Sequence, residues 1–384
     1  MEGTKISHEE RSEAPQVDTV MKLQELISAI QPLDQAAMKA ARRQQDQLTK
    51  PQGSLGRLEE ISLQVAGIMG SSTLPGLQKK VVVVMAGDHG VVAEGVSAYP
   101  QDVTAQMVMN FLVGGAAINV FARQAGARVI IVDMGIVSDL TPEPGLRVRK
   151  VGRGTANLSR GPAMTRAQAE ESILAGAEVI REEIERGLDI LATGDMGIGN
   201  TTASAAIAAA ILGAPAEAVA GRGTGVDEAG LRRKIEAIQR GLEVNRPNGS
   251  DGLDVLAKVG GFEIGGLAGA MMGSAAGRKP VVIDGFISGA AAMIAVRLAP
   301  AVRGYLFAGH VSEERGHRLM LEWLQLRPLL DLNLRLGEGT GAVLAMPAVA
   351  PLVRAAMNQP VTAEITPLST KTQSSTRLTE IPKL

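Results

Sequence analysis

The sequence lacks cysteine and has few aromatic residues and no long apolar run. Without cysteine it has no disulfides, thiolate catalysis, iron–sulfur clusters or cysteine zinc sites. Aromatic residues make up 2% of its 384 positions, too few for the stacking platforms that bind single-stranded nucleic acid. No apolar run approaches the roughly 20 residues of a membrane span, and no secretory signal pattern is present. We therefore expect a cytoplasmic protein that binds neither membrane nor nucleic acid.

The sequence also has no excess of positive or negative charge. The 39 Lys and Arg residues nearly balance the 40 Asp and Glu residues, and the formal net charge is -1. A strongly basic surface for polyanions is therefore not expected. The four histidines show no close pairing of the kind that holds a metal ion, so we expect no metal site and no cofactor. These histidines are His8, His89, His310 and His317.

Small and β-branched residues are abundant instead, including 45 glycines. Continuous apolar runs such as Val81-Val82-Val83-Val84 are typical of buried parallel strands. Because such runs alternate with helical patterns, the sequence predicts an α/β fold with a mostly parallel sheet and right-handed crossovers. The predicted strands cover residues 81–86, 129–133, 188–193, 281–284 and 304–308. A long helix is predicted over 166–186, with Thr165 as its cap.

The chain divides into five segments by composition and periodicity. The first is polar and without periodicity, which is typical of disorder, and the last is a polar tail. We expect a disordered extension over 1–20, an N-terminal helical segment over 21–70, a parallel-sheet domain over 71–335, a loop with a C-terminal helix over 336–366, and the tail over 367–384.

A glycine-rich loop, residues 194–202, follows the third predicted strand and opens an alanine-rich helix. Its glycines let backbone N–H groups approach a ligand and its polar side chains add short donors, so a phosphate could bind at this helix N-terminus. The alternative is a tight strand-to-helix turn with a polar cap. The loop lacks the third glycine of a dinucleotide fingerprint and the lysine of a Walker loop. The candidate ligand contacts are Gly197, Gly199, Asn200, Thr201 and Thr202.

A second loop, residues 336–342, places Glu338 among three glycines just before an apolar helix. Glu338 is either a catalytic base or a carboxylate that complements the helix dipole. In a parallel sheet the loops that follow strands gather at one edge, which would bring Asp195 and Glu338 near the candidate phosphate-binding amides. This arrangement suits a negatively charged ligand with a proton to be removed.

Two further residues have open interpretations. His89 and its neighbour Asp88 follow the first predicted strand, where function is expected, but His89 could also be a loop histidine bonded to backbone. Lys234 lies in a predicted helix after the loop 221–225, and from the pattern alone it is a solvent-exposed lysine.

Six motifs in chain order together resemble the nicotinate-nucleotide:dimethylbenzimidazole phosphoribosyltransferase family. The resemblance runs from about residue 22 to residue 360, and the series is far more specific than any one motif. The motifs are KPQGSLGRLE at 50–59, GDHGV at 87–91, GDMGIGNTT at 194–202, KVGGFE at 258–263, DGFIS at 284–288 and LGEGTGA at 336–342.

The resemblance implies a Rossmann-like sheet, a small helical domain made from the chain ends, and a homodimer. It also implies the reaction: phosphoribose passes from nicotinate mononucleotide to 5,6-dimethylbenzimidazole, giving α-ribazole 5'-phosphate and nicotinate for the lower ligand of cobalamin. The substrates themselves are then the expected partners.

The resemblance also implies roles for residues. Glu338 falls on the family's general base, and Asp195 on an acidic residue that assists near the nucleotide, where relatives often carry glutamate. Besides the glycine loop, the predicted nucleotide contacts are Gly223, Lys234, Ser312, Gly337 and Gly339. The predicted benzimidazole contacts are Asp88, Tyr99, Met107 and Leu336.

Two other functions fit a similar sheet. A nucleotide-dependent oxidoreductase is disfavoured by the missing dinucleotide fingerprint. A non-catalytic azole- or nucleotide-binding protein would be favoured if the shorter Asp195 marked a loss of activity.

Overall fold

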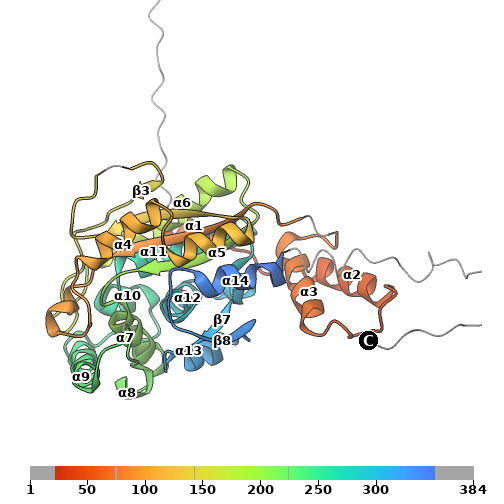
Figure 1. The fold of residues 1–384 in the computed structure, drawn as a ribbon. Helices are drawn as coiled ribbons and strands as arrows, with labels where there is room; N and C mark the ends of the chain where they lie inside the picture. Colours follow the sequence, from red (N-terminus) through yellow and green to blue (C-terminus); the bar gives the residue numbers. More distant parts are fainter. Residues whose placement is uncertain (1–21, 74–75, 142, 224, 351–384) are drawn as a thin grey trace, which may run out of the picture.

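A six-stranded, all-parallel sheet in the order β3-β2-β1-β4-β5-β6 forms the centre of the molecule (Figure 1). The computed structural model describes residues 22–73, 76–141, 143–223 and 225–350. Valines 81–84 are at most 2% exposed, as expected for a central strand covered on both faces. The predicted α/β fold is confirmed. The strands are β1 Lys80–Gly87, β2 Ala127–Gly135, β3 Leu146–Val148, β4 Ile190–Met196, β5 Val281–Ile283 and β6 Leu306–Ala308.

Helices cover both faces of this sheet. α4, α5 and α14 pack along one face, and α11 and α12 along the other. The α-helices are α1 Leu23–Ala29, α2 Gln35–Asp46, α3 Arg57–Met69, α4 Val103–Leu112, α5 Ala117–Ala125, α6 Arg166–Glu185, α7 Asn200–Leu212, α8 Ala216–Val219, α9 Glu228–Asn245, α10 Gly252–Val259, α11 Phe262–Ala276, α12 Phe286–Leu298, α13 His317–Leu324 and α14 Thr340–Val349. Two 3-10 helices, η1 Gly90–Glu94 and η2 Pro300–Tyr305, complete the described helical segments.

Helix α11 lies between the sheet and α6, and its residues 262–275 are all buried. Its glycines allow this packing, because a Cβ atom at Gly269 would overlap the carbonyl oxygen of Ile173 on α6. On α6, a Cβ atom at Gly176 would likewise overlap the carbonyl oxygen of Gly266. The glycine-rich composition of this segment is therefore a requirement of helix packing.

The N-terminal helices occupy two places. α1 packs against α6 and α11, whereas α2 and α3 pair with each other at the side of the molecule, where α3 meets α14 (Figure 1). The five-segment domain division stays a prediction. The expected extension over 1–20, the tail over 367–384 and the end of the 336–366 segment lie outside the described residues.

Several predicted boundaries differ from the structure. The third strand begins at Ile190 rather than residue 188, and the segment predicted as a strand from residue 304 begins within η2. Strand β3 was not predicted, because it is three residues long and lacks an apolar run. A second, two-stranded parallel sheet was also not predicted; it pairs β7 His310–Ser312 with β8 Leu330–Leu334.

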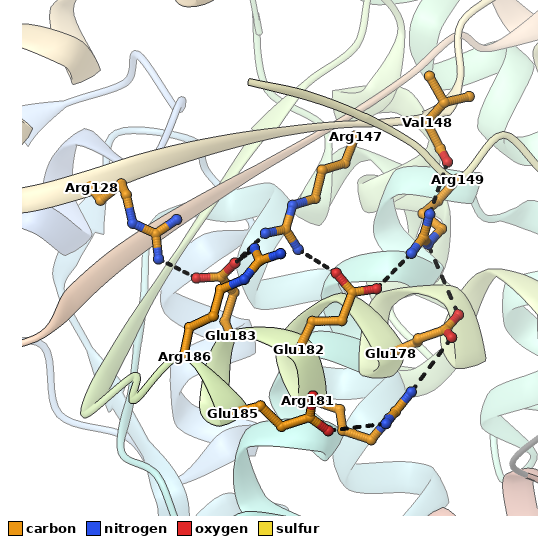
Figure 2. A network of polar contacts seen from close by, with 10 residues as sticks. All are labelled: Arg128, Arg147, Val148, Arg149, Glu178, Arg181, Glu182, Glu183, Glu185 and Arg186. Carbon is orange, nitrogen blue, oxygen red and sulfur yellow. Dashed lines mark hydrogen bonds and ion pairs between the residues drawn. The ribbon is translucent and has the colours of Figure 1, made fainter. Parts of the chain in front are cut away.

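Edge strand β3 is fastened to α6 by a network of ion pairs (Figure 2). At its centre Glu183 is fully buried and accepts hydrogen bonds from Arg128, Arg147 and Arg186. Arg147 of β3 also donates to Glu182 at 2.9 Å. Because these arginines reach Glu183 from β2, β3 and the residue that follows α6, the network ties strand and helix together at the amino end of β2 and the carboxyl end of α6.

The segment Val103–Ala125 has the length and hydropathy of a membrane helix by composition alone. In the fold it is two helices, α4 and α5, which are separated at Gly114-Gly115 and pack against the sheet. Only 33% of its most apolar window is buried, so these helices leave apolar side chains on the surface.

We expect Glu183→Gln to lower the free energy of unfolding by about 3 kcal/mol, because it leaves Arg147 without a buried counter-charge. The measurement is chemical denaturation at neutral pH. Glu185→Gln is the matched control: Glu185 pairs with Arg181 on the exposed side of α6, and its loss should cost less than about 1 kcal/mol. Equal effects of the two substitutions would contradict the central role of Glu183.

Candidate active site

A cavity of about 470 Å³ lies at the carboxyl ends of β4 and β5. Six parts of the chain form its walls: α4 with the loop before it, the loop after β4, the loop at Gly223, the start of α12, β7 with the residues after it, and the loop before α14. It therefore occupies the edge of the sheet where the sequence places the candidate loops. The predicted site residues that line it are Tyr99, Met107, Asp195, Gly197, Asn200, Thr201, Gly223, Ser312, Leu336, Gly337 and Glu338.

The remaining predicted residues lie around this cavity without lining it. Gly199 is the N-cap of α7, with φ +94°, and Thr202 is buried in the first turn of that helix. Gly339 is buried behind Glu338. Lys234 lies beneath Thr201, and Asp88 turns away, since its Oδ2 accepts a hydrogen bond from the backbone N–H of Val137 at 2.8 Å.

Glu338 adopts a left-handed backbone conformation, with φ 63°. Residues other than glycine rarely take this conformation, and when they do the strain is often found at functional sites. The side chain is 6% exposed, and its Oε2 accepts a hydrogen bond from the backbone N–H of Ile118, in the first turn of α5, at 3.4 Å. Gly194 of β4 permits this loop to approach, because a Cβ atom there would overlap the carbonyl oxygen of Glu338.

Asp284 fixes the loop that carries Glu338. It is fully buried at the end of β5, and its two carboxylate oxygens accept hydrogen bonds from the backbone N–H groups of Gly339 at 3.1 Å and Ala342 at 3.0 Å. It thereby acts as the cap of α14, satisfying amides that would otherwise lack partners. The ring Nε2 of His310 lies 3.4 Å from Asp284. Burial lowers the pKa of His310, but the hydrogen bond and charge of Asp284 outweigh burial and raise it.

The carboxylates of the cavity have different electrostatic surroundings. Burial raises the pKa of Asp195 well above its ordinary value, and the charges of Asp284 and Glu263 raise it further. Asn200 opposes this through a hydrogen bond from its Nδ2 to Asp195 Oδ2 at 3.0 Å. Burial also raises the pKa of Glu338, against the stabilising N–H group of Ile118. Burial thus favours the protonated form of both carboxyl groups, and in each case one hydrogen bond favours the charged form instead.

A buried lysine lies beneath one end of the cavity. Lys234 is 1% exposed, so its interpretation as a solvated helix lysine is wrong. Its Nζ donates to Thr201 Oγ1 at 3.0 Å and to the carbonyl oxygen of Gly221 at 3.2 Å. Burial lowers its pKa to about 8, against the attraction of Glu314. Glu314 itself accepts a hydrogen bond from the N–H group of Gly223 at 2.8 Å.

Apolar side chains line another part of the cavity. Tyr99 and Leu336 are 53% and 56% exposed, so they are available to a ligand. An apolar wall with few polar groups suits a planar aromatic ligand. The apolar lining residues are Tyr99, Val103, Met107, Met196, Ile198, Phe286, Ile287 and Leu336.

Sequence reasoning missed several residues of this site. Asp284 ends a predicted strand and His310 follows one, and that position was a usable signal for both. Glu314 gave no such signal, because its role depends on the loop at Gly223, which is distant in sequence. The sequence also could not show that His89 bonds to a side chain, Glu263, rather than to backbone.

A family model described as "Phosphoribosyltransferase" matches residues 30–364. A relative from Roseiflexus sp. (strain RS-1), named nicotinate-nucleotide--dimethylbenzimidazole phosphoribosyltransferase, is 62% identical over 324 residues, which cover 84% of this chain and 92% of the relative. A relative of the same name from Desulforudis audaxviator is 58% identical over 328 residues, covering 85% and 93%. A crystal structure of that enzyme from Thermus thermophilus aligns with a TM-score of 0.81 at 52% identity, covering 86% of this chain and 98% of the other.

We expect Asp284→Asn to loosen the loop around Glu338, because the amide side chain has one acceptor oxygen for two backbone N–H groups. Hydrogen exchange of the amides of Gly339 and Ala342 should become about 10- to 100-fold faster, as expected for losing a hydrogen bond to a charged group. The measurement is hydrogen–deuterium exchange over residues 336–343.

Asp251→Asn is the matched control, because Asp251 caps α10 through the N–H groups of Leu253 and Asp254 at 3.0 and 3.1 Å. Because one oxygen, Oδ1, accepts both bonds, Asn can keep them, so exchange in both α10 and the Glu338 loop should stay nearly unchanged in Asp251→Asn. Unaltered exchange at residues 339 and 342 in Asp284→Asn would contradict the anchoring role.

Proposed function

The chain belongs to the nicotinate-nucleotide:dimethylbenzimidazole phosphoribosyltransferase family, and from this premise we propose that the cavity beside Glu338 is its active site. The protein is an enzyme that transfers phosphoribose from nicotinate mononucleotide to 5,6-dimethylbenzimidazole. The products are α-ribazole 5'-phosphate and nicotinate, and the first serves in assembly of the lower ligand of cobalamin. The oxidoreductase alternative has no support from these comparisons.

The reaction needs a base. The pyridine-like nitrogen of the azole attacks C1' of the ribose as the bond from C1' to the nicotinate nitrogen breaks. Positive charge then develops on the azole, and the proton on its other nitrogen becomes acidic. A carboxylate near that nitrogen takes the proton, which typically accelerates such a step by about 10² to 10⁴.

The observation that carries the assignment of this base is the conformation of Glu338. Glu338 has a strained backbone, the loop that carries it is held by Asp284, and it lines the cavity. These three features support its role as the carboxylate that faces a bound azole. The N–H group of Ile118 favours the ionised form of Glu338, while burial raises its pKa and so strengthens it as a base.

The nucleotide fits the polar end of the cavity. Lys234 and the hydroxyl of Thr201 supply charge and a donor for the phosphate, and the N-terminus of α7 adds backbone amides. Ser312, 7% exposed, lines the same cavity. The azole fits the apolar side, against Tyr99 and Leu336. The ribose then lies between Glu338 and the residues that bind the phosphate.

Asp195 takes a different role from Glu338. Its pKa is raised well above the ordinary value, and its Oδ2 accepts a hydrogen bond from Asn200 at the start of α7, beside the proposed phosphate contacts, so we assign it as a polar contact to the nucleotide and not as the base. Two carboxyl groups in one cavity thus divide the work, with Glu338 as base and Asp195 as a polar contact to the nucleotide. The neutral form also avoids adding another negative charge beside the anionic substrate.

A homodimer belongs to the same proposal. Support comes from exposed apolar side chains on α5 and in the turn between α4 and α5, since exposed apolar surface marks association sites. Val113, Val120 and Phe121 are 78%, 51% and 36% exposed.

The central test is Glu338→Gln, which should lower kcat by about 10² to 10⁴ while nicotinate mononucleotide still binds. Turnover is followed as α-ribazole 5'-phosphate formed from the two substrates, and binding by calorimetry. In the wild type, kcat/KM should fall with decreasing pH through the raised pKa of Glu338, because the base must be deprotonated. Turnover at the wild-type rate in Glu338→Gln would refute the assignment.

Asp195→Asn should retain activity within about tenfold of the wild type, since an amide preserves a neutral hydrogen-bonding group. Asp195→Ala should lose more, because it removes the contact altogether. Both are measured in the same assay as Glu338→Gln. A loss in Asp195→Asn as large as that in Glu338→Gln would mean that Asp195 acts as an ionised carboxylate.

A further inference from the structure

A buried pair that does not line the cavity lies directly beneath its glycine loop. The ring Nε2 of His89 is 2.6 Å from Oε1 of Glu263, and both residues are 0% exposed. His89 follows β1, and Glu263 is in the first turn of α11. Of the two, only Glu263 affects a residue assigned to the reaction, because its charge raises the pKa of Asp195.

The pair is costly to bury. An ionised carboxylate or imidazolium inside a protein is tolerated only when a partner compensates for lost hydration. Burial lowers the pKa of His89, but the charge of Glu263 and the hydrogen bond to it outweigh burial and raise that pKa. His89 Nδ1 and Glu263 Oε2 find no hydrogen-bond partner in the described part of the chain. The pair therefore depends on one short contact.

The glycine loop packs against the His89 side of this pair. A Cβ atom at Gly197 would lie 3.5 Å from His89 Nε2, and one at Gly199 would lie 3.2 Å from His89 Cβ. On the other side, a Cβ atom at Gly87 would lie 2.8 Å from Glu263 Oε2. His89 is thus one of the groups against which the glycine loop packs, together with the carbonyl oxygen of Gly87 beside Gly197 and the side chain of Val92 beside Gly199.

The same pair reaches two other parts of the site. His89 is the N-cap of η1, which leads to the loop that carries Tyr99 in the apolar wall. The charge of Glu263 also contributes to the raised pKa of Asp195, which is part of the glycine loop. Because His89 packs directly against the glycine loop and is connected to Tyr99 only through η1, a change in the pair should alter the nucleotide contacts more than the apolar wall.

We propose that His89 and Glu263 are positioning residues that hold the loop 197–199 against the nucleotide. The inference rests on the proposed function, because it assigns that loop to nicotinate mononucleotide. The pair makes no contact with the reacting atoms. Its effect is geometric: the amides at the start of α7 and the side chains of Asn200 and Thr201 keep their places only while the pair beneath them is intact.

The test is His89→Gln in the full chain. The KM for nicotinate mononucleotide should rise about 10- to 100-fold, as expected for contacts displaced by a fraction of an ångström to 1 Å. The KM for dimethylbenzimidazole should change less than about threefold, and calorimetry should show the same weakening of nucleotide binding without turnover. Glu263→Gln retains an oxygen and an amide near His89, so it should show a smaller rise.

The double variant His89→Gln/Glu263→Gln tests the pairing. Two neutral amides can bond to each other, so the double variant should recover part of the loss seen in His89→Gln, which independent residues would not do. If His89→Gln fails to fold, Glu263→Gln and the double variant carry the test.

The matched control is Glu183→Gln, which alters another fully buried carboxylate at the opposite edge of the sheet. It should lower stability without changing either KM. An unchanged KM for the nucleotide in folded His89→Gln, or a change no larger than in Glu183→Gln, would overturn the proposal. Absence of turnover in the wild type would instead refute the proposed function, while calorimetry of nucleotide binding would still test the pair.

Discussion

The geometry of the site depends on Asp284. Its two carboxylate oxygens accept the backbone N–H groups of Gly339 and Ala342, and so one side chain joins the end of β5 to the start of α14. Glu338 immediately precedes the first of these amides, in a conformation that costs free energy unless its surroundings impose it. The sheet therefore holds Asp284, Asp284 holds the start of α14, and this in turn fixes the backbone conformation of Glu338 in the cavity.

Much of the fold could be predicted from the sequence because the central strands are continuous apolar runs. β1 and β2 appeared at nearly their observed positions, and Thr165 was correctly identified as the cap of α6. β3 could not be found in this way, because what holds it is a set of arginines meeting Glu183. Such contacts join residues that are distant in sequence, so they produce no periodic pattern of apolar residues from which a strand could be predicted.

The site was predictable to the extent that its residues follow strands. Asp195, Glu338 and the glycine loop meet in one cavity, as parallel topology requires. Asp88 also follows a strand, yet it bonds to the backbone at Val137 and does not line the cavity. The end of a strand predicts that a residue lies at the edge of the sheet near the cavity. It does not predict whether the side chain points into the cavity, because that depends on the conformation of the turn. The cytoplasmic location and the roles of individual residues stay predictions.

The position of α11 between the sheet and α6 has a consequence for synthesis of the protein. β1, β2 and α6 leave the ribosome well before α11 does, yet α11 covers the apolar surface that they share. At about 5–20 residues per second, the surface stays uncovered for on the order of 10 s. During that interval the nascent chain carries a β-rich, valine-lined surface, so its yield in a cell will depend on chaperones that shield it.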